Sequence, residues 1–439
     1  MKKLLTRLGL GAALLALLFG VCSLRWHAPR LARPPRLVAS ARGTGPLLAG
    51  AAVVPLRFSR PVPLAGFPHY SFAAQGERDR VAVRALVLRE EGLTIALVSA
   101  EILLVPGDLA RALEREVSDL KLDRVVLAAT HTHAGPGGYW DEPLGERFAT
   151  GPFDRAVFEL LVGRAALAVR EAERALRPAR LAVAFGSAPE LAWGRGGGAV
   201  DGHLVRARLS DPGGAPIAEV VLFPAHATLL GPANRLISGD WPGALMRAGA
   251  APVLFFQGAL GDQAPRMPPG EPPNPEAYAR AIGARIDALV EGAPDPSPAL
   301  AAAACRIGLP SPDPGAVPPF LRRVARNLLD PLLPAEAELV ALRLGPLTLL
   351  AVPGEPVAEV GRRFRALAGP GSEILSLAGD YLGYVETEER TARGAGETAH
   401  TYYGPELAGR LGLGVKLVAE VVRGPAAPTG EDAAGGPPP

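Results

Sequence analysis

Short apolar runs of the kind that form β-strands alternate along this 439-residue chain with longer stretches in which apolar residues recur at helical spacing. The runs that predict strands are residues 81–88, 93–99, 125–129, 181–185 and 218–223. The helical patterns cover residues 109–120, 153–176 and 276–290. This alternation favours a mixed α and β domain over an all-helical or an all-β one.

Later in the chain, residues 339–344 and 347–352 form two apolar runs separated only by Gly345 and Pro346. So short a connection predicts a hairpin rather than a helical crossover, and a purely parallel sheet is therefore not expected. We predict an α+β fold with mixed β-sheets flanked by helices. The chain is long enough for one large domain or for two closely packed ones.

The two ends differ from this central body in composition. Lys2, Lys3 and Arg7 precede the apolar run of residues 8–22, which is typical of a secretory signal, so we expect an exported protein, periplasmic or extracellular. Phe19 and Val21 stand where small residues would mark a cleavage site, so residues 1–24 are predicted to be either a cleaved signal peptide or an uncleaved anchor. Residues 25–50 are interpreted as a Pro- and Arg-rich linker, 51–423 as the folded domain, and 424–439 as a disordered tail.

Charge and cysteine content exclude several classes of protein. The chain has 46 basic and 44 acidic side chains, and no basic stripe interleaved with aromatic residues occurs along it, so nucleic acid is not an expected partner. Cys22 lies in the N-terminal apolar run, which leaves Cys305 alone in the folded body. A framework of intrachain disulfides is therefore excluded there.

The strongest local motif is Ala-Thr-His-Thr-His-Ala-Gly-Pro-Gly-Gly at residues 129–138, directly after a predicted strand. Histidines two positions apart share one face of an extended strand end, and the glycines and proline that follow impose an irregular loop. His131 and His133 can then point into one cleft. The alternative is a pair of hydrogen-bonded loop histidines with no ligand.

Two other positions carry groups that bind metals. His226 follows the predicted strand 218–223, and Glu355 follows the apolar run 347–352 and a Pro-Gly step. Singly, His226 is better explained as a core histidine and Glu355 as an acid at the start of a helix. With His131 they supply the nitrogen and oxygen ligands of a catalytic zinc site, but only the fold can bring such distant positions together.

Taken in order, several motifs resemble those of the neutral ceramidases. Besides the histidine motif, they are the Ser-Gly-Asp loop at 238–240, the Gly-Asp loop at 261–262, Val-Pro-Gly-Glu at 352–355 followed by Gly-Arg-Arg, and Tyr-Leu-Gly-Tyr at 381–384. They cover roughly residues 66–413. The resemblance implies a catalytic domain that hydrolyses the amide bond of N-acylsphingosines with one zinc ion, a lipid substrate and a membrane surface nearby.

The resemblance also implies roles for individual residues. Four of them match the family's zinc ligands: His131, His226, Glu355 and Tyr384. By the same resemblance, His133 would face the substrate, Tyr381 would donate a hydrogen bond to the oxyanion that forms, and Arg195 would bind substrate.

The sequence departs from the family pattern at three places. Ala264 stands where the family has an active-site serine, so covalent serine catalysis at that position is excluded. The loop after Met267 is short and rich in proline, and the family's usual C-terminal β-sandwich module is not expected.

These features give a leading function and two alternatives. The leading one is a zinc-dependent amide hydrolase in which metal-activated water attacks the amide, a scheme that tolerates Ala264. The alternatives are a catalytically silent lipid-binding homologue and a zinc amidohydrolase that acts on an amide outside the sphingolipids. No protein partner is inferred.

Overall fold

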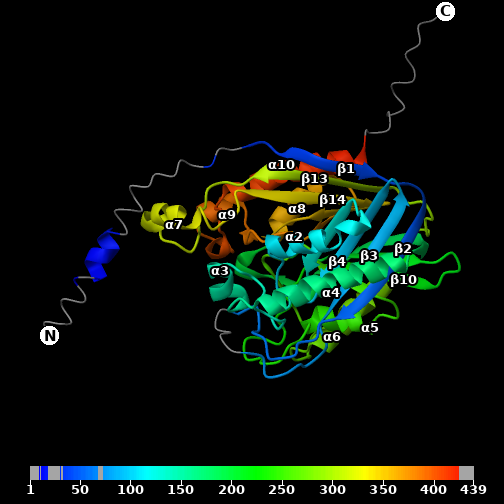
Figure 1. The fold of residues 1–439 in the computed structure, drawn as a ribbon, viewed down its shortest axis with the longest axis horizontal. Coiled ribbons are helices and arrows are strands. Elements are labelled where there is room, and N and C mark those ends of the chain that lie inside the picture. The colour runs from blue at the N-terminus through cyan, green and yellow to red at the C-terminus, as the bar shows by residue number, and fades with distance from the viewer. Residues whose placement is uncertain (1–8, 10, 18–29, 31–32, 68–72, 425–439) are drawn as a thin grey trace, which may run out of the picture.

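Three β-sheets of four or five strands form the framework of the fold (Figure 1). The computed structural model describes residues 9, 11–17, 30, 33–67 and 73–424. Each sheet is antiparallel except for one adjacent pair of parallel strands, and a helix connects each parallel pair. The predicted mixed fold with helices flanking mixed sheets is confirmed, and so is the hairpin around Gly345.

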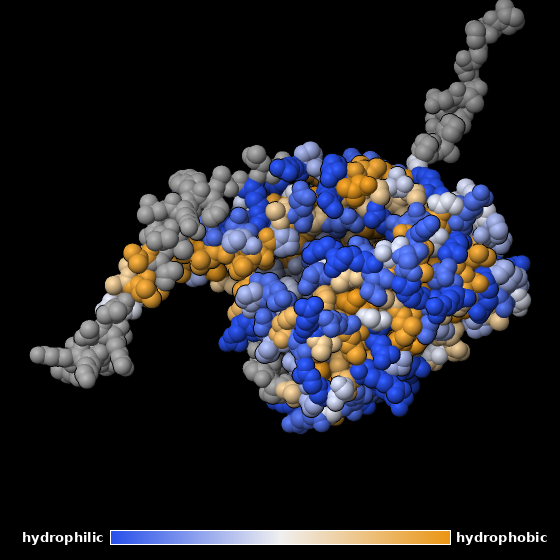
Figure 2. Space-filling view, in the orientation of Figure 1, coloured by the Kyte–Doolittle hydropathy of each residue, from blue (hydrophilic) through white to orange (hydrophobic). Residues whose placement is uncertain are grey.

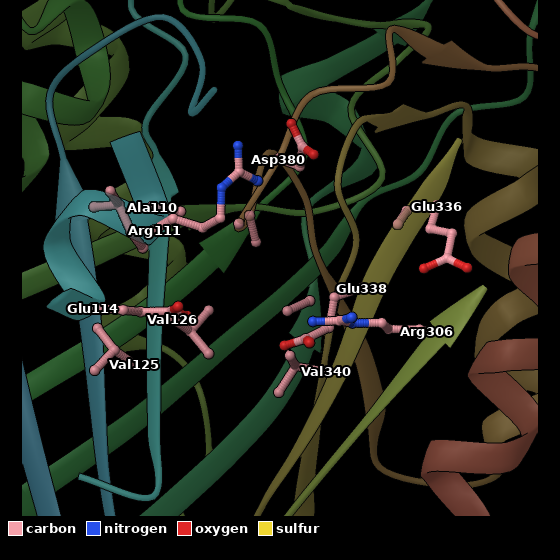
Figure 3. A pocket seen from close by; sticks show the side chains of 15 residues that line it. Ala110, Arg111, Glu114, Val125, Val126, Arg306, Glu336, Glu338, Val340 and Asp380 are labelled. Carbon is pink, nitrogen blue, oxygen red and sulfur yellow. The ribbon is translucent and has the colours of Figure 1, made fainter. Parts of the chain in front are cut away.

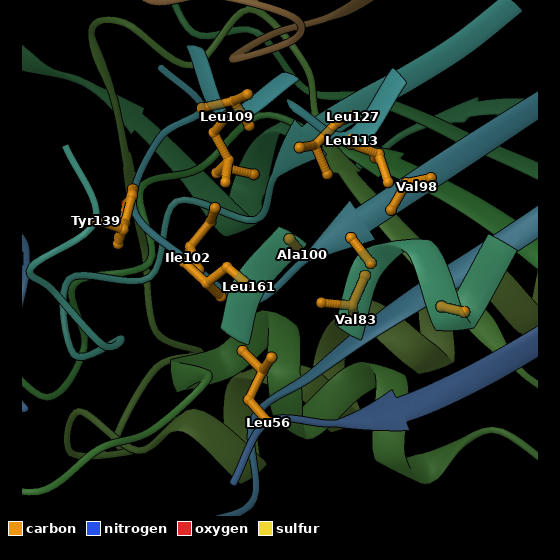
Figure 4. Packing of buried hydrophobic residues seen from close by; sticks show 14 of the residues in the cluster. Leu56, Val83, Val98, Ala100, Ile102, Leu109, Leu113, Leu127, Tyr139 and Leu161 are labelled. Carbon is orange, nitrogen blue, oxygen red and sulfur yellow. The ribbon is translucent and has the colours of Figure 1, made fainter. Parts of the chain in front are cut away.

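The first sheet has the strand order β5-β4-β3-β2-β6. Its strands are β5 (Arg124–Ala129), β4 (Leu93–Ala100), β3 (Ala82–Glu91), β2 (Thr44–Pro55) and β6 (Arg177–Pro178). Helix α2 (Gly107–Glu116) connects the parallel strands β4 and β5, and α4 (Arg155–Arg174) lies across the sheet. Leu113 of α2 and Leu161 of α4 are buried in the same apolar cluster as Val83 and Val98 of the sheet (Figure 4). Burial of this kind is the main favourable term in folding.

The second sheet has the order β11-β10-β9-β7. Its strands are β11 (Val253–Gln257), β10 (Pro216–Phe223), β9 (His203–Ser210) and β7 (Arg180–Ser187). Helix α5 (Asp240–Ala248) connects β10 to the parallel β11. Helix α6 (Pro275–Asp287) packs on α5, where Trp241 and Tyr278 are buried in edge-to-face contact.

The third sheet has the order β1-β13-β14-β15-β17. Its strands are β1 (Arg36–Arg42), β13 (Leu300–Gly308), β14 (Glu336–Leu344), β15 (Leu347–Ala351) and β17 (Ser372–Leu375). Helix α8 (Ala358–Ala368) connects β15 to the parallel β17, and α10 (Glu406–Arg423) packs on β13 and β14. Smaller elements complete the fold: β8 (Ala192–Gly194) paired with β12 (Gln263–Pro265), β16 (Glu355–Pro356) paired with β18 (Tyr384–Val385), and the helices α3 (Pro143–Gly145), α7 (Arg322–Leu329) and α9 (Glu388–Ala392).

The N-terminal part of the chain differs from its prediction. Residues 25–50 were interpreted as a linker, but β1 and most of β2 lie within that range. The reason is tertiary: β1 pairs with β13 more than 260 positions later, while Leu47 and Ala49 are buried among residues of several sheets. Small apolar residues between prolines and arginines carried too little periodicity to show this.

The two ends of the chain remain predictions. Most of residues 1–24 and all of residues 425–439 lie outside the described ranges. Within those ranges, no helix combines the length and the apolar character that a membrane-crossing segment needs.

Candidate metal centre

His131 begins the site immediately beyond β5, where the backbone turns sharply. Its φ is +65°, a left-handed conformation that non-glycine residues rarely adopt and that usually costs about 1–3 kcal/mol. Its backbone N–H donates to the Ile102 carbonyl at 3.1 Å, and its Nδ1 lies 2.8 Å from the Leu103 carbonyl oxygen. Because a carbonyl only accepts, Nδ1 must carry the proton, so the lone pair of Nε2 points into the site.

His226 repeats this arrangement beyond β10. Its Nδ1 lies 2.9 Å from the Gln263 carbonyl oxygen, so its Nε2 also presents a lone pair. Burial, and then the charge of Arg195, lowers the pKa of His226 to about 4, which keeps this imidazole neutral at neutral pH. A parallel bridge between Thr132 and Ala227 brings the two histidine loops side by side.

Glu355 and Tyr384 come from the short parallel ladder of β16 and β18, in which they are directly opposite each other. Glu355 Oε2 lies 3.4 Å from His131 Nε2 and 3.3 Å from His226 Nε2. Tyr384 Oη lies 3.0 Å from His226 Nε2. The four residues predicted as zinc ligands therefore converge, although they come from three separate parts of the chain.

The donor set fits a metal ion. Glu355 Oε2 is buried and has no hydrogen-bond partner among the described residues, and the two imidazole nitrogens nearest to it present lone pairs. A buried carboxylate oxygen facing lone pairs costs free energy unless a cation lies between them. Two imidazoles and a carboxylate with a further oxygen are ligands that zinc accepts.

His133 lies directly against the other two histidines, although the resemblance predicted that it faces the substrate. Its Nε2 lies 3.2 Å from His131 Nε2, and the three histidines together form a group able to hold a metal ion. Burial, followed by the charges of His131 and His226, places the pKa of His133 well below its ordinary value. Phe67 packs against its ring at 5.1 Å between ring centroids. The geometry thus offers His133 either as a ligand or as a neighbour of the ligands.

Tyr381 contacts the cluster from the other side. Its Oη donates to Glu355 Oε1 at 2.8 Å, so the two carboxylate oxygens of Glu355 have different surroundings. Burial and the negative charge of Glu355 raise the pKa of Tyr381 well above its ordinary value, so this hydroxyl stays a hydrogen-bond donor at any physiological pH.

Arg195 and Ala264 border the site without contacting the metal cluster's carboxylate. Arg195 donates to the Gly261 carbonyl at 2.6 Å and to Tyr384 Oη at 3.3 Å, and it forms an ion pair with Glu397 at 3.2 Å. Ala264 lies in β12 opposite Trp193 of β8, one position after the carbonyl that holds His226. These positions are compatible with the predicted roles and do not test them.

The sequence analysis missed Gln257, at the end of β11. Its Nε2 donates to the carbonyls of Thr130 at 3.0 Å and Ala225 at 2.8 Å, and its Oε1 accepts from the Ala225 N–H at 3.2 Å. Thr130 and Ala225 directly precede His131 and His226, so one buried amide links the two histidine loops. The only signal in the sequence was that Gln257, a polar residue, directly follows the apolar run 253–256.

Two cavities share Asp380, the residue before Tyr381, in their walls. A cavity of about 430 Å³ has Tyr381 in its wall, together with Trp140, Leu144, Tyr402 and residues 331–334. A second cavity, of about 300 Å³, lies between α2 and β5 on one side and β13 and β14 on the other. Charged side chains line the second cavity, among them Glu114, Arg306 and Glu338 (Figure 3).

The sequence is similar to that of proteins named neutral ceramidases. Residues 60–249 match the family model described as neutral/alkaline non-lysosomal ceramidase, N-terminal. A neutral ceramidase of Mycobacterium tuberculosis is 25% identical over 448 aligned residues, which cover 75% of this chain and 69% of that protein. A neutral ceramidase of Pseudomonas aeruginosa is 26% identical over 37% of this chain and 28% of its own length.

Solved structures show the same fold. The crystal structure of the Pseudomonas aeruginosa neutral ceramidase superposes with a TM-score of 0.70 at 20% identity, covering 86% of this chain and 74% of that one. A ceramidase complexed with C2 gives a TM-score of 0.71 over 86% of this chain and 75% of its own.

Fold and site together define a mixed α and β protein with a largely buried cluster of three histidines that could hold a metal ion. The particular proteins that this chain is similar to are the neutral ceramidases, and the resemblance predicted from the motifs is confirmed.

Proposed function

We propose that this chain is a zinc-dependent hydrolase that cleaves the amide bond of N-acylsphingosine or of a related N-acyl lipid. The observation that carries the proposal is the convergence of two imidazole lone pairs on a buried carboxylate oxygen that has no donor. The relatives named neutral ceramidases support the substrate class.

In this proposal, His131, His226, Glu355 and Tyr384 hold the ion, with the two Nδ1 hydrogen bonds fixing the imidazoles. A zinc ion bound there supplies Lewis acidity, which polarises a carbonyl and makes water more acidic. We assign Glu355 to the ligand set because a carboxylate offsets the positive charge of the ion.

The remaining residues act on the substrate directly. Tyr381, held neutral, would redirect its one hydroxyl proton from Glu355 Oε1 to the oxygen that becomes negative as the amide carbon turns tetrahedral. His133, whose low pKa keeps it neutral, would accept a proton from the attacking water at a ring nitrogen and return it to the departing amine. Arg195 orients the substrate from the Tyr384 side. Ala264 offers no nucleophile, so no acyl group is transferred to that position.

The test measures zinc content and hydrolysis of a fluorogenic ceramide in the parent, His131→Ala and His133→Ala proteins. We expect one bound zinc and metal-dependent turnover in the parent, and loss of both in His131→Ala. His133→Ala should keep its zinc and lose turnover by about 10²–10⁴-fold, the usual contribution of a general acid–base group. Full zinc binding and full hydrolysis in His131→Ala would refute the proposal, and loss of zinc in His133→Ala would assign His133 to the ligands instead.

Ala264 favours a second candidate, a lipid-binding homologue without activity. It predicts that the zinc-saturated protein binds N-acyl lipids with no turnover, whereas a zinc amidohydrolase for other amides would cleave N-acyl compounds that are not sphingolipids. A panel of N-acyl compounds at saturating zinc separates the three functions. An exported location, with the substrate in a nearby membrane, completes the proposal.

A further inference from the structure

Residues 319–329 form a short amphipathic segment in which no side chain is buried. In this segment, the 3₁₀ turn Pro319–Leu321 leads into α7. Phe320 is 78% exposed, Leu328 52% and Leu332 43%. Orange surface lies in Figure 2 where Figure 1 places α7. Large apolar side chains gathered on one exposed segment indicate an interaction surface rather than ordinary surface variation.

This segment leads directly to the candidate site. Residues 331–334, which follow α7, line the cavity of about 430 Å³, and Tyr381 lines the same cavity. Tyr381 in turn donates to Glu355 of the metal cluster. Leu144 also lines this cavity, and Phe148, four positions later, is 56% exposed. Exposed apolar side chains therefore occur close in sequence to two parts of the cavity wall.

The charge of the segment indicates its partner. Residues 314–329 contain three arginines, Arg322, Arg323 and Arg326, and no acidic residue. Arg322 and Arg326 donate through Nε to the carbonyls of Val317 and Pro312, which fixes the side chains. The two acids that flank the segment are paired with arginines, Asp313 with Arg322 at 3.9 Å and Asp330 with Arg30 at 3.0 Å, so basic side chains still outnumber acidic ones here. A helix that combines exposed apolar residues with arginines has the composition of helices that lie in the interface of an anionic bilayer.

We propose that Phe320, Leu321, Leu328 and Leu332, with the three arginines, form a docking surface for an anionic lipid bilayer. We call these residues the α7 docking surface. The inference rests on the proposed function, because an N-acyl lipid must leave a bilayer to reach the metal cluster. Docking through α7 brings residues 331–334, and with them the cavity beside Tyr381, to the membrane surface.

The test uses the full chain and reads insertion at the segment itself, because residues 8–22 are also apolar and would contribute to binding of the whole protein. An environment-sensitive dye is attached to Leu328→Cys in a Cys22→Ser background, where Cys305 is buried. The matched control carries the dye at Val290→Cys, since Val290 is 89% exposed and is not part of α7. We expect a blue shift with phosphatidylglycerol vesicles at position 328 and none at 290.

Activity provides the second readout. The double variant Phe320→Ser/Leu328→Ser should lose at least tenfold of its turnover of ceramide in phosphatidylglycerol vesicles and keep its turnover of a short-chain, detergent-dispersed substrate. Val290→Ser should change neither. An unchanged dye spectrum at 328, or an equal shift at 290, would overturn the docking surface. A blue shift at 328 in a protein that cleaves no N-acyl lipid would support docking while refuting the proposed function.

Discussion

At the scale of single residues, the clearest functional signal is the backbone of His131. A left-handed conformation at a residue with a side chain is strained, and such strain persists where the surroundings impose it. Here the hydrogen bonds to Ile102 and Leu103 hold both the backbone and the ring. The contacts that hold the strained backbone therefore also fix the direction in which the Nε2 lone pair points.

This strain predicts an unusual order of stability. His131→Gly and His131→Ala both remove the imidazole, but alanine keeps the penalty of the left-handed conformation and glycine does not. We expect His131→Gly to have the larger free energy of unfolding, by about 1 kcal/mol. Urea unfolding measures the difference. At Thr130, whose φ is not positive, the glycine variant should be the less stable of the two; the same order at both positions would contradict the argument.

A second residue predicts how stability depends on pH. Glu90 of β3 is buried, and this burial raises its pKa to about 7 from an ordinary value of 4.5. The folded protein then binds more protons than the unfolded chain between about pH 4.5 and pH 7, so the free energy of unfolding falls as pH rises through that window. We expect Glu90→Gln to be more stable than the parent by about 1–2 kcal/mol at pH 8 and nearly equal to it at pH 4.

Thermal unfolding at both pH values tests this. Glu91→Gln is the control, because Glu91 is the next residue on the same strand and its side chain is exposed. If Glu91→Gln gained as much stability at pH 8 as Glu90→Gln, the effect would come from the change in net charge and not from the burial of Glu90.

At the scale of elements, the ends of β5, β10 and β11 act as one unit. His131 follows β5, His226 follows β10, and Gln257 closes β11 while bonding to the residue before each histidine. In sheets with parallel pairs, sites form beyond the carboxyl ends of the strands, and here two sheets contribute such ends to one site.

Gln257 is accordingly expected to position the candidate metal ligands. We expect Gln257→Glu, which lacks the amide donor, to lower zinc affinity by about 10–100-fold, the usual effect of disturbing a residue behind a ligand. Chelator competition measures the affinity, and the visible spectrum of the cobalt-substituted protein reports the ligand geometry. Ser99→Ala is the matched control: Ser99 is also buried and donates to β11, at the Phe255 carbonyl, 2.7 Å away. If Gln257→Glu lowers the stability of the protein but not its zinc affinity, the role of Gln257 is purely structural.

At the scale of the whole molecule, the candidate ligands join parts of the fold that are otherwise held by apolar packing. One buried cluster contains residues of all three large sheets. Three of the candidate ligands each follow a strand of a different sheet: His131 comes after β5, His226 after β10 and Glu355 after β15. A metal that binds only when these parts are assembled stabilises the folded state by mass action.

Removal of the metal should therefore lower the melting temperature. At a zinc concentration 100-fold above the dissociation constant, we expect a stabilisation of about 2.7 kcal/mol over the chelator-treated protein, restored when zinc is added back. Differential scanning calorimetry measures it. His131→Ala should show no response to zinc, and an equal response in that variant would place the ion elsewhere.

The motifs predicted the residues of the candidate centre. His131, His226, Glu355 and Tyr384 were predicted as ligands from the family resemblance, and the structure brings each of them within 3.4 Å of another member of the set, though their role as ligands stays a prediction. The local alternation of strand and helix patterns predicted the mixed sheets and the hairpin around Gly345. These features depend on side-chain type and on neighbours within a few positions, which the sequence displays directly.

The features that were not predicted from the sequence depend on contacts between residues that are far apart in the chain. The strand character of residues 36–42 needs β13, and the role of Gln257 needs Thr130 and Ala225. The wall of the larger cavity beside the site combines residues 331–334 with Tyr381. Only tertiary structure decides such features, because hydrogen bonds and cavities form between segments whose separation in sequence carries no local pattern. The sequence by itself determined which groups are present for chemistry, and the packing of the three sheets determined where those groups meet.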